Sequence, residues 1–242
     1  MVRRLSFIAH ARVLALSLLV VAPAAWGQPG VFEIMLNGGQ VGTASCKIVA
    51  TTHGYSSTTV MHVTTHGLDY SLSKTEQLSP SHQFEHVLLS AVVNNEAVSV
   101  TGSLASAKIV LHISANGHTV TTPLTAHAGA VFMPDFDPGA FETLLALAAE
   151  RNNRGLWAII PKQSGAIAPI QLATYEDQQG TLNGKTITVH HLVATIGGSQ
   201  ANIYSSADNQ LMQANLPQQG FVLVYKGFAL KPLSGAAAAP AN

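Results

Sequence analysis

The sequence predicts a mainly β protein: a single curved antiparallel sheet, either a half-barrel or an open barrel, with one helix packed across it. Apolar and polar residues alternate with a period of two along many short segments, as expected when one face of a sheet is wet. Turn dipeptides typical of hairpins, Asn37-Gly38, Asn116-Gly117 and Asn183-Gly184, punctuate these segments. A helical period stands out in one place only, after Asp137.

The first half of the chain reads as a run of hairpins. The alternation around Phe32, Ile34 and Leu36 predicts an opening strand, and the Asn37-Gly38-Gly39 turn leads into its partner. Thr and Val enrichment supports the strands that follow, since these residues pack well on a pleated surface. The expected strand segments lie at 40–50, 56–65, around 70–72, 84–92, 98–101, 108–113 and 119–125.

The helix is predicted from about Pro138 to Asn153. Asp137 is a good N-cap and Pro138 a good first residue. Apolar side chains then recur at i, i+3, i+4 and i+7, and this stripe must bury against the sheet because an isolated helix of this length is marginal in water. The stripe consists of Phe141, Leu144, Leu145 and Ala148.

After the helix the strand pattern resumes. We expect strands around Ile170 and Leu172, then at 185–196, 201–205 and 211–214, with a closing strand at 221–230. Glu176 and Asp177 precede the turn signal Gln178-Gln179-Gly180, so a solvated loop is expected there rather than a calcium site, which needs six to eight oxygen ligands. We expect one β-rich domain over 28–233, followed by a disordered Ala/Pro tail at 234–242.

The N-terminus has the pattern of a signal peptide over residues 1–27. Arg3 and Arg4 precede an apolar run from Val13 to Ala25 that is short for a membrane span, and cleavage is expected before Gln28. The alternative is an uncleaved anchor. The pattern predicts export to the periplasm or outside the cell, with no transmembrane segment after cleavage.

Composition excludes some classes of protein. Only 10% of residues are charged and the net charge is zero, which argues against a nucleic-acid binder held by a basic surface. Cys46 is the only cysteine, so no intramolecular disulfide forms, and we expect a buried thiol.

No motif in the sequence marks a catalytic or metal site. There is no Gly-x-Ser-x-Gly elbow, His-Glu-x-x-His pair or phosphate-binding glycine loop, so we assign no catalytic residue, metal or cofactor and lean away from an enzyme. Helix capping and a turn account for Asp137 and Asp135 better than acid–base catalysis does. His62, His86 and His191 remain an alternative for a cross-strand metal site, although hydrogen-bonded sheet histidines are the simpler interpretation.

Three blocks carry a resemblance to exported half-barrel proteins. They are residues 32–42, then, after the helix, residues 182–189, and finally residues 207–212 before a last strand ending at Gly227-Phe228. In this order the chain resembles periplasmic lipoprotein carriers of the LolA/LolB kind and uncharacterised periplasmic families built like them. The resemblance implies a curved sheet whose apolar concave face holds a lipid or acyl chain, and it supplies no catalytic residues. The low aromatic content, 6%, departs from carriers that line their cavity with large rings.

These observations favour a non-enzymatic binding or carrier protein for an apolar, lipid-like ligand. An envelope structural or protein-interaction module is the second hypothesis, and a metal-assisted hydrolase is the third. The residues expected to line the ligand cavity, each equally suited to an ordinary core, are Phe84, Leu88, Ile109, Leu111, Phe141, Leu145, Ile187 and Val189.

Overall fold

A computed structural model describes residues 29–162 and 164–232 of the 242-residue chain. The expected signal peptide at 1–27, its cleavage site and the tail at 234–242 lie outside the described residues.

The N-terminal half is an antiparallel meander in which each strand pairs with the next. Two-residue turns with left-handed residues, such as Asn37 and Gly38, join most of these strands. The meander comprises β1 (Gly30–Leu36), β2 (Gly39–Thr51), β3 (Gly54–Thr65), β4 (Leu68–Leu78), β5 (Phe84–Val93), β6 (Glu96–Ala105), β7 (Lys108–Ala115) and β8 (His118–Thr125).

The C-terminal half continues the same sheet from the other edge of β1. β1 pairs with β15 from Phe32↔Tyr225 to Leu36↔Phe221, so the full order is β8 to β1, then β15 back to β9. The strands of this half are β9 (Ala130–Phe132), β10 (Leu156–Ile160), β11 (Ala166–Leu182), β12 (Lys185–Ile196), β13 (Ser199–Ser205), β14 (Leu211–Leu216), β15 (Phe221–Tyr225) and β16 (Phe228–Leu230).

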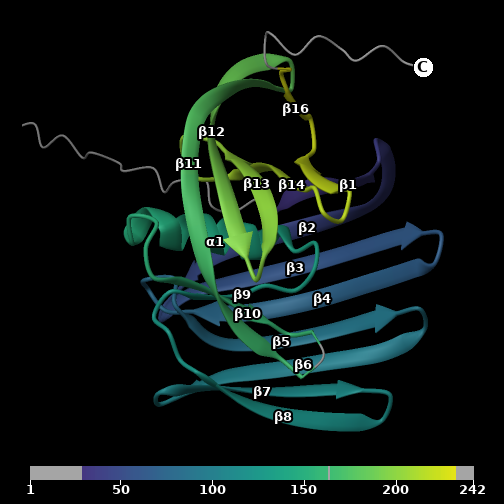
Figure 1. Ribbon diagram of the computed structural model, residues 1–242, viewed down its shortest axis with the longest axis vertical. Helices are drawn as coiled ribbons and strands as arrows, with labels where there is room; N and C mark the ends of the chain where they lie inside the picture. Colours follow the sequence, from purple (N-terminus) through teal and green to yellow (C-terminus); the bar gives the residue numbers. More distant parts are fainter. Residues whose placement is uncertain (1–28, 163, 233–242) are drawn as a thin grey trace, which may run out of the picture.

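The sheet is strongly curved and unclosed, as the alternation predicted. In Figure 1, β2 to β8 run side by side across the lower part of the molecule, and β11 to β13 cross them at a steep angle. The two ends of the strand order, β8 and β9, are not hydrogen-bonded to each other. The main core fills the inside of this curl with residues from both halves, from Phe32 to Leu223.

The helix α1 (Pro138–Glu150) lies inside the curl. It contacts β2, β3, β9, β10 and β14. The predicted stripe is buried: Phe141 and Leu145 are 6% and 4% exposed, and Leu144 is fully buried. The helix ends three residues earlier than predicted, because Asn152 and Asn153 adopt left-handed backbone conformations that no α-helix continues through.

Two segments differ from the sequence prediction. The expected loop after Glu176-Asp177 is wrong: the segment lies inside the 17-residue strand β11, where the register shifts between Tyr175 and Gln178. A bulge there lets the strand bend without ending, so the turn-forming residues serve curvature. The expected closing strand at 221–230 is also two strands, because the chain turns at Gly227 (φ 84°) and β16 folds back to pair with β11.

The described part of the chain contains no helix with the length and apolar character that crossing a membrane requires.

Candidate functional site

An elongated hollow of about 570 Å³ crosses the outer face of β1 to β5, on the side of the sheet away from α1. Five adjacent strands contribute to it, each through a segment of one to three residues. Its lining consists of Val31, Thr43, Ala44, Ser45, Val60, Met61, His62, Ser71, Leu72, Ser73, Ser90, Ala91 and Val92.

Strand register explains the shape of the hollow. Successive cross-strand pairs align Val31, Ser45, Val60, Ser73 and Ser90 in one outward row. A second row, one step along the strands, contains Thr43, His62, Ser71 and Val92. Serine and threonine make up more than half of these two rows, so little side-chain volume fills the sheet surface between the larger residues.

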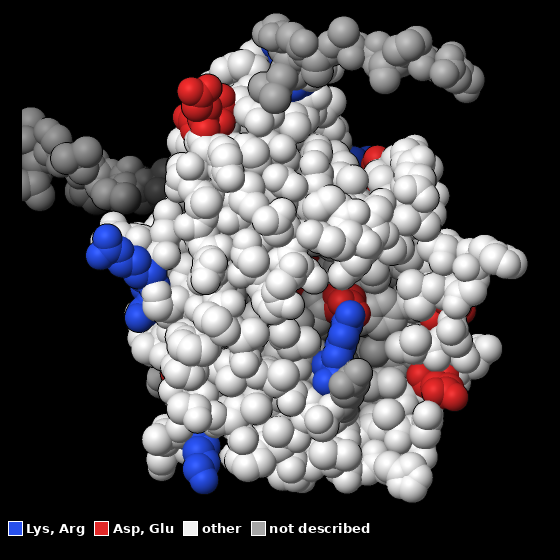
Figure 2. Space-filling view, in the orientation of Figure 1, with Lys and Arg blue, Asp and Glu red and all other residues white. Residues whose placement is uncertain are grey.

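The walls of the hollow are apolar and exposed. Val31, Val60 and Val92, on the alternate strands β1, β3 and β5, are 38%, 58% and 41% exposed. No Lys, Arg, Asp or Glu lines the hollow. Its volume falls in the range typical of small-molecule sites. On the molecular face drawn in Figure 2, too, the charged side chains are few and scattered among uncharged residues.

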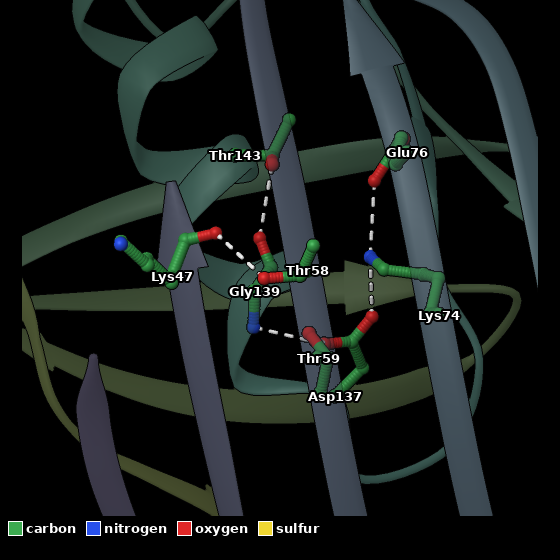
Figure 3. A network of polar contacts seen from close by, with 8 residues as sticks. All are labelled: Lys47, Thr58, Thr59, Lys74, Glu76, Asp137, Gly139 and Thr143. Atoms are coloured by element: carbon green, nitrogen blue, oxygen red, sulfur yellow. Dashed lines mark hydrogen bonds and ion pairs between the residues drawn. The ribbon is translucent and has the colours of Figure 1, made fainter. Parts of the chain in front are cut away.

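The inner face of the same strands carries a buried ion network. Lys74 on β4 is 1% exposed and pairs with two buried carboxylates, Glu76 Oε2 at 3.0 Å and Asp137 Oδ2 at 2.5 Å (Figure 3). The other oxygen of Asp137 accepts hydrogen bonds from Thr59 Oγ1 at 2.7 Å and from the backbone amide of Gly139 at 2.9 Å. The network therefore joins β3, β4 and the first turn of α1.

Burial and charge act in opposite directions in this network. Burial lowers the pKa of Lys74, but the adjacent Asp137 and Glu76 outweigh it and raise that pKa above its usual range. Burial raises the pKa of Glu76, and the nearby Lys74 ammonium offsets part of this effect. Lys74 therefore remains charged, as the ion that compensates the helix cap.

Two further contacts hold α1 against the sheet. At its C-terminal end, Glu150 Oε1 lies 2.7 Å from His82 Nδ1, and the His82 ring stacks on Tyr55. Near its middle, burial raises the pKa of Glu142 to about 7, although hydrogen bonds from the Cys46 thiol and the Leu211 amide oppose the shift. Cys46 is buried as expected, and burial raises its pKa as well.

The residues predicted to bind a ligand are not gathered at the hollow. Phe84, Ile109, Leu111, Phe141 and Leu145 lie in the main core. Val189 is buried in a small second core with Tyr204, Met212 and Phe228, and Ile187 packs against that core. Leu88 is 51% exposed on the outer face of β5, next to the hollow but not in its lining. Their role in ligand binding stays a prediction.

The histidines considered as metal ligands lie on separate strands. His62 is on β3 and hydrogen-bonds Asp69, His86 is on β5, and His191 is on β12 between Gln178 and Asn202. Within residues 29–162 and 164–232, no cluster of three or more His, Cys, Asp or Glu side chains is arranged to hold a metal.

Sequence reasoning missed Lys74 and Glu76. The alternation along the strand contained the signal, because Lys74 and Glu76 occupy the same face of β4 as Leu72 and Leu78, whose side chains point into the core. Charged residues at apolar positions of a strand indicate a buried ion pair. The hollow had a weaker signal, namely the small outward residues Ser71 and Ser73 flanking Leu72.

Comparison with one solved structure supports the β-barrel-like fold. The chain is similar to a β-barrel-like protein of the domain of unknown function DUF1849 from Brucella abortus, with a TM-score of 0.54 and 12% identity over 84% of this chain and 97% of that one. It also matches a DUF1089 family protein from Pseudomonas aeruginosa, with a TM-score of 0.41 and 8% identity over 83% and 97% of the two chains. No family model and no curated protein matches this sequence. The likeness to lipoprotein carriers stays a prediction.

Proposed function

We propose that this chain is an exported binding protein for an apolar, lipid-like ligand, and that the ligand binds in the hollow on the outer face of β1 to β5. The observation that carries the proposal is an elongated hollow with exposed valine walls and no charged lining. A contiguous apolar hollow on a protein surface favours binding of an apolar ligand, because covering it removes apolar area from water.

The concave side is a poorer candidate for the site. Helix α1 fills it, and most of the residues first considered as cavity lining are close-packed there. A ligand inside the curl requires α1 to move away from β2 and β3, and the Lys74–Asp137 and His82–Glu150 contacts oppose such a movement.

A fluorescent fatty acid whose emission rises in an apolar environment tests the proposal. We expect saturable binding to the purified protein and a loss of at least tenfold in affinity for Ser73→Phe, because the ring fills the middle of the hollow. Thr101→Phe is the matched control: Thr101 is exposed on the outer face of β6 and outside the lining.

Equal binding by the Ser73→Phe and Thr101→Phe variants contradicts the outer-face site. No binding by the unmodified protein contradicts the function itself. A protein partner from envelope extracts that binds stoichiometrically, and whose binding Ser73→Phe blocks, supports instead the second hypothesis of an interaction module.

A further inference from the structure

We propose, on the basis of the function proposed above, that the ligand is a single unbranched acyl chain lying across the strands. The length of the hollow then limits the length of the chain that it covers. The observation behind this step is the shape of the lining. Each of the five strands contributes at most three consecutive residues, so the hollow is long across the sheet and narrow along it.

The dimensions correspond to one extended chain. Neighbouring strands lie about 4.8 Å apart, so four steps from β1 to β5 span about 19 Å, while three residues along a strand cover only about 7 Å. At about 1.3 Å per methylene along an extended chain, the strand spacing gives a hollow about 15 carbons long.

The lining also defines the polarity of the ligand. The row that crosses all five strands contains two valines and three serines, from Val31 through Val60 to Ser90, and no Lys, Arg, Asp or Glu lines the hollow. An ionised head group buried there lacks a partner of opposite charge, which is costly. The head group therefore extends beyond one end of the hollow, and the hydrocarbon occupies it.

A series of saturated fatty acids tests the inference by competition with the fluorescent probe. Because only one side of the chain is covered, we expect about a twofold gain in affinity per methylene, below the gain for full burial. The gain should stop near 15 carbons, where the chain outgrows the hollow. Fatty acids and their methyl esters should bind within about twofold of each other.

Variants at the two ends make the test specific. Ser90→Leu blocks the β5 end. The chain length at which affinity stops rising, here called the plateau, should then be shorter by about four carbons, the length of one strand spacing. Ser45→Leu should shorten the accepted chain from the β1 side, which covers the case in which Ser90→Leu fails to fold. Thr101→Leu, outside the lining, should leave the plateau unchanged.

The inference is overturned if affinity keeps rising beyond 18 carbons at an unchanged slope. It is also overturned if Ser90→Leu weakens all chain lengths equally, or if a sterol-like competitor binds more tightly than every fatty acid. Absence of binding at all chain lengths is a different result, because it contradicts the proposed function rather than the length measurement.

Discussion

Lys74 Nζ lies 2.5 Å from Asp137 Oδ2, so a lysine inside a strand neutralises the residue that caps the helix. The two carboxylate oxygens of Asp137 have different partners. Oδ1 accepts hydrogen bonds from Gly139 and Thr59, and Oδ2 forms the ion pair with Lys74. Because the side chains of Thr59, Lys74 and Asp137 are all buried, α1 can dock in only one register against β3 and β4 without leaving a charge unpaired.

Replacement of the lysine alone should be strongly destabilising. Lys74→Met leaves two carboxylates buried without a cation, and we expect a loss of about 3–5 kcal/mol in the free energy of unfolding, measured by urea denaturation. The triple variant Lys74→Met/Glu76→Gln/Asp137→Asn removes the charges together and retains a capping side chain, so it should recover most of the loss. A triple variant no more stable than Lys74→Met alone contradicts this account.

Gly139 should be intolerant of a side chain, although it lies in a helix, where alanine is normally favoured. An added Cβ would lie 2.6 Å from Thr59 Oγ1 and 3.1 Å from Ser57 Oγ. We expect Gly139→Ala to cost about 1–3 kcal/mol through this overpacking. Gly39→Ala is the control, since its Cβ would meet only the Leu36 carbonyl oxygen at 3.7 Å. Equal melting temperatures for the two variants argue against close approach of α1 to β3.

Truncation of Phe141 and of Leu88 should destabilise the protein to very different extents. Phe141 is 6% exposed between α1 and the sheet, so Phe141→Ala should cost about 3–5 kcal/mol. Leu88 is 51% exposed, and Leu88→Ala should cost less than about 1 kcal/mol. Denaturant melts with and without a fatty acid complete the test: the loss for Phe141→Ala should not depend on ligand, whereas a ligand-dependent loss indicates a site inside the curl.

Glu142 should make stability depend on pH between about 4.5 and 7. Burial raises its pKa in the folded protein to about 7, so in this window the folded state keeps a proton that the unfolded state has released. Stability from this group is therefore greatest below about pH 4.5 and declines as pH rises to 7, by about 3 kcal/mol in all.

The test of Glu142 is a difference between two proteins. The side chain in Glu142→Gln does not titrate. The unmodified protein should therefore lose stability relative to this variant as pH rises, which the midpoints of urea denaturation measure. Glu96→Gln, at an exposed position on β6, should follow the unmodified protein. A constant difference between the unmodified protein and Glu142→Gln over the whole range means that Glu142 titrates normally.

The predictable part of the fold was the local part. Alternation and Asn-Gly turns predict hairpins because both signals depend on neighbouring residues, and the Asp137–Pro138 start of α1 is confirmed for the same reason. The split of the last strand at Gly227 and the continuity of β11 past Tyr175 were not predictable in this way. The split depends on pairing between β11 and β16, which joins Gly180 to Leu230 and leaves no local pattern. The continuity depends on a bulge in the pairing of β11 with β12, where the register shifts between Tyr175 and Gln178.

The candidate site was less predictable than the fold. A sequence pattern separates the two faces of a strand but does not say which face is covered by helix and which is open. The sequence therefore placed the ligand among apolar residues such as Phe84 and Leu145, which the structure buries in the main core. The hollow arises instead from small residues aligned across five strands, and that alignment is known only once the register is known.

The pairing of β1 with β15 has a consequence for how the chain reaches its native state. The two strands are about 190 positions apart, whereas each of the strands β1 to β7 pairs with its immediate successor. Local hairpins form early, but contacts between distant segments require a slow search. The edge of β1 that pairs with β15 therefore remains open until the last strands arrive, and during that interval it is exposed to pairing with another chain. Glu33 is an interior residue of this edge strand, where its charge opposes stacking of like copies during the interval.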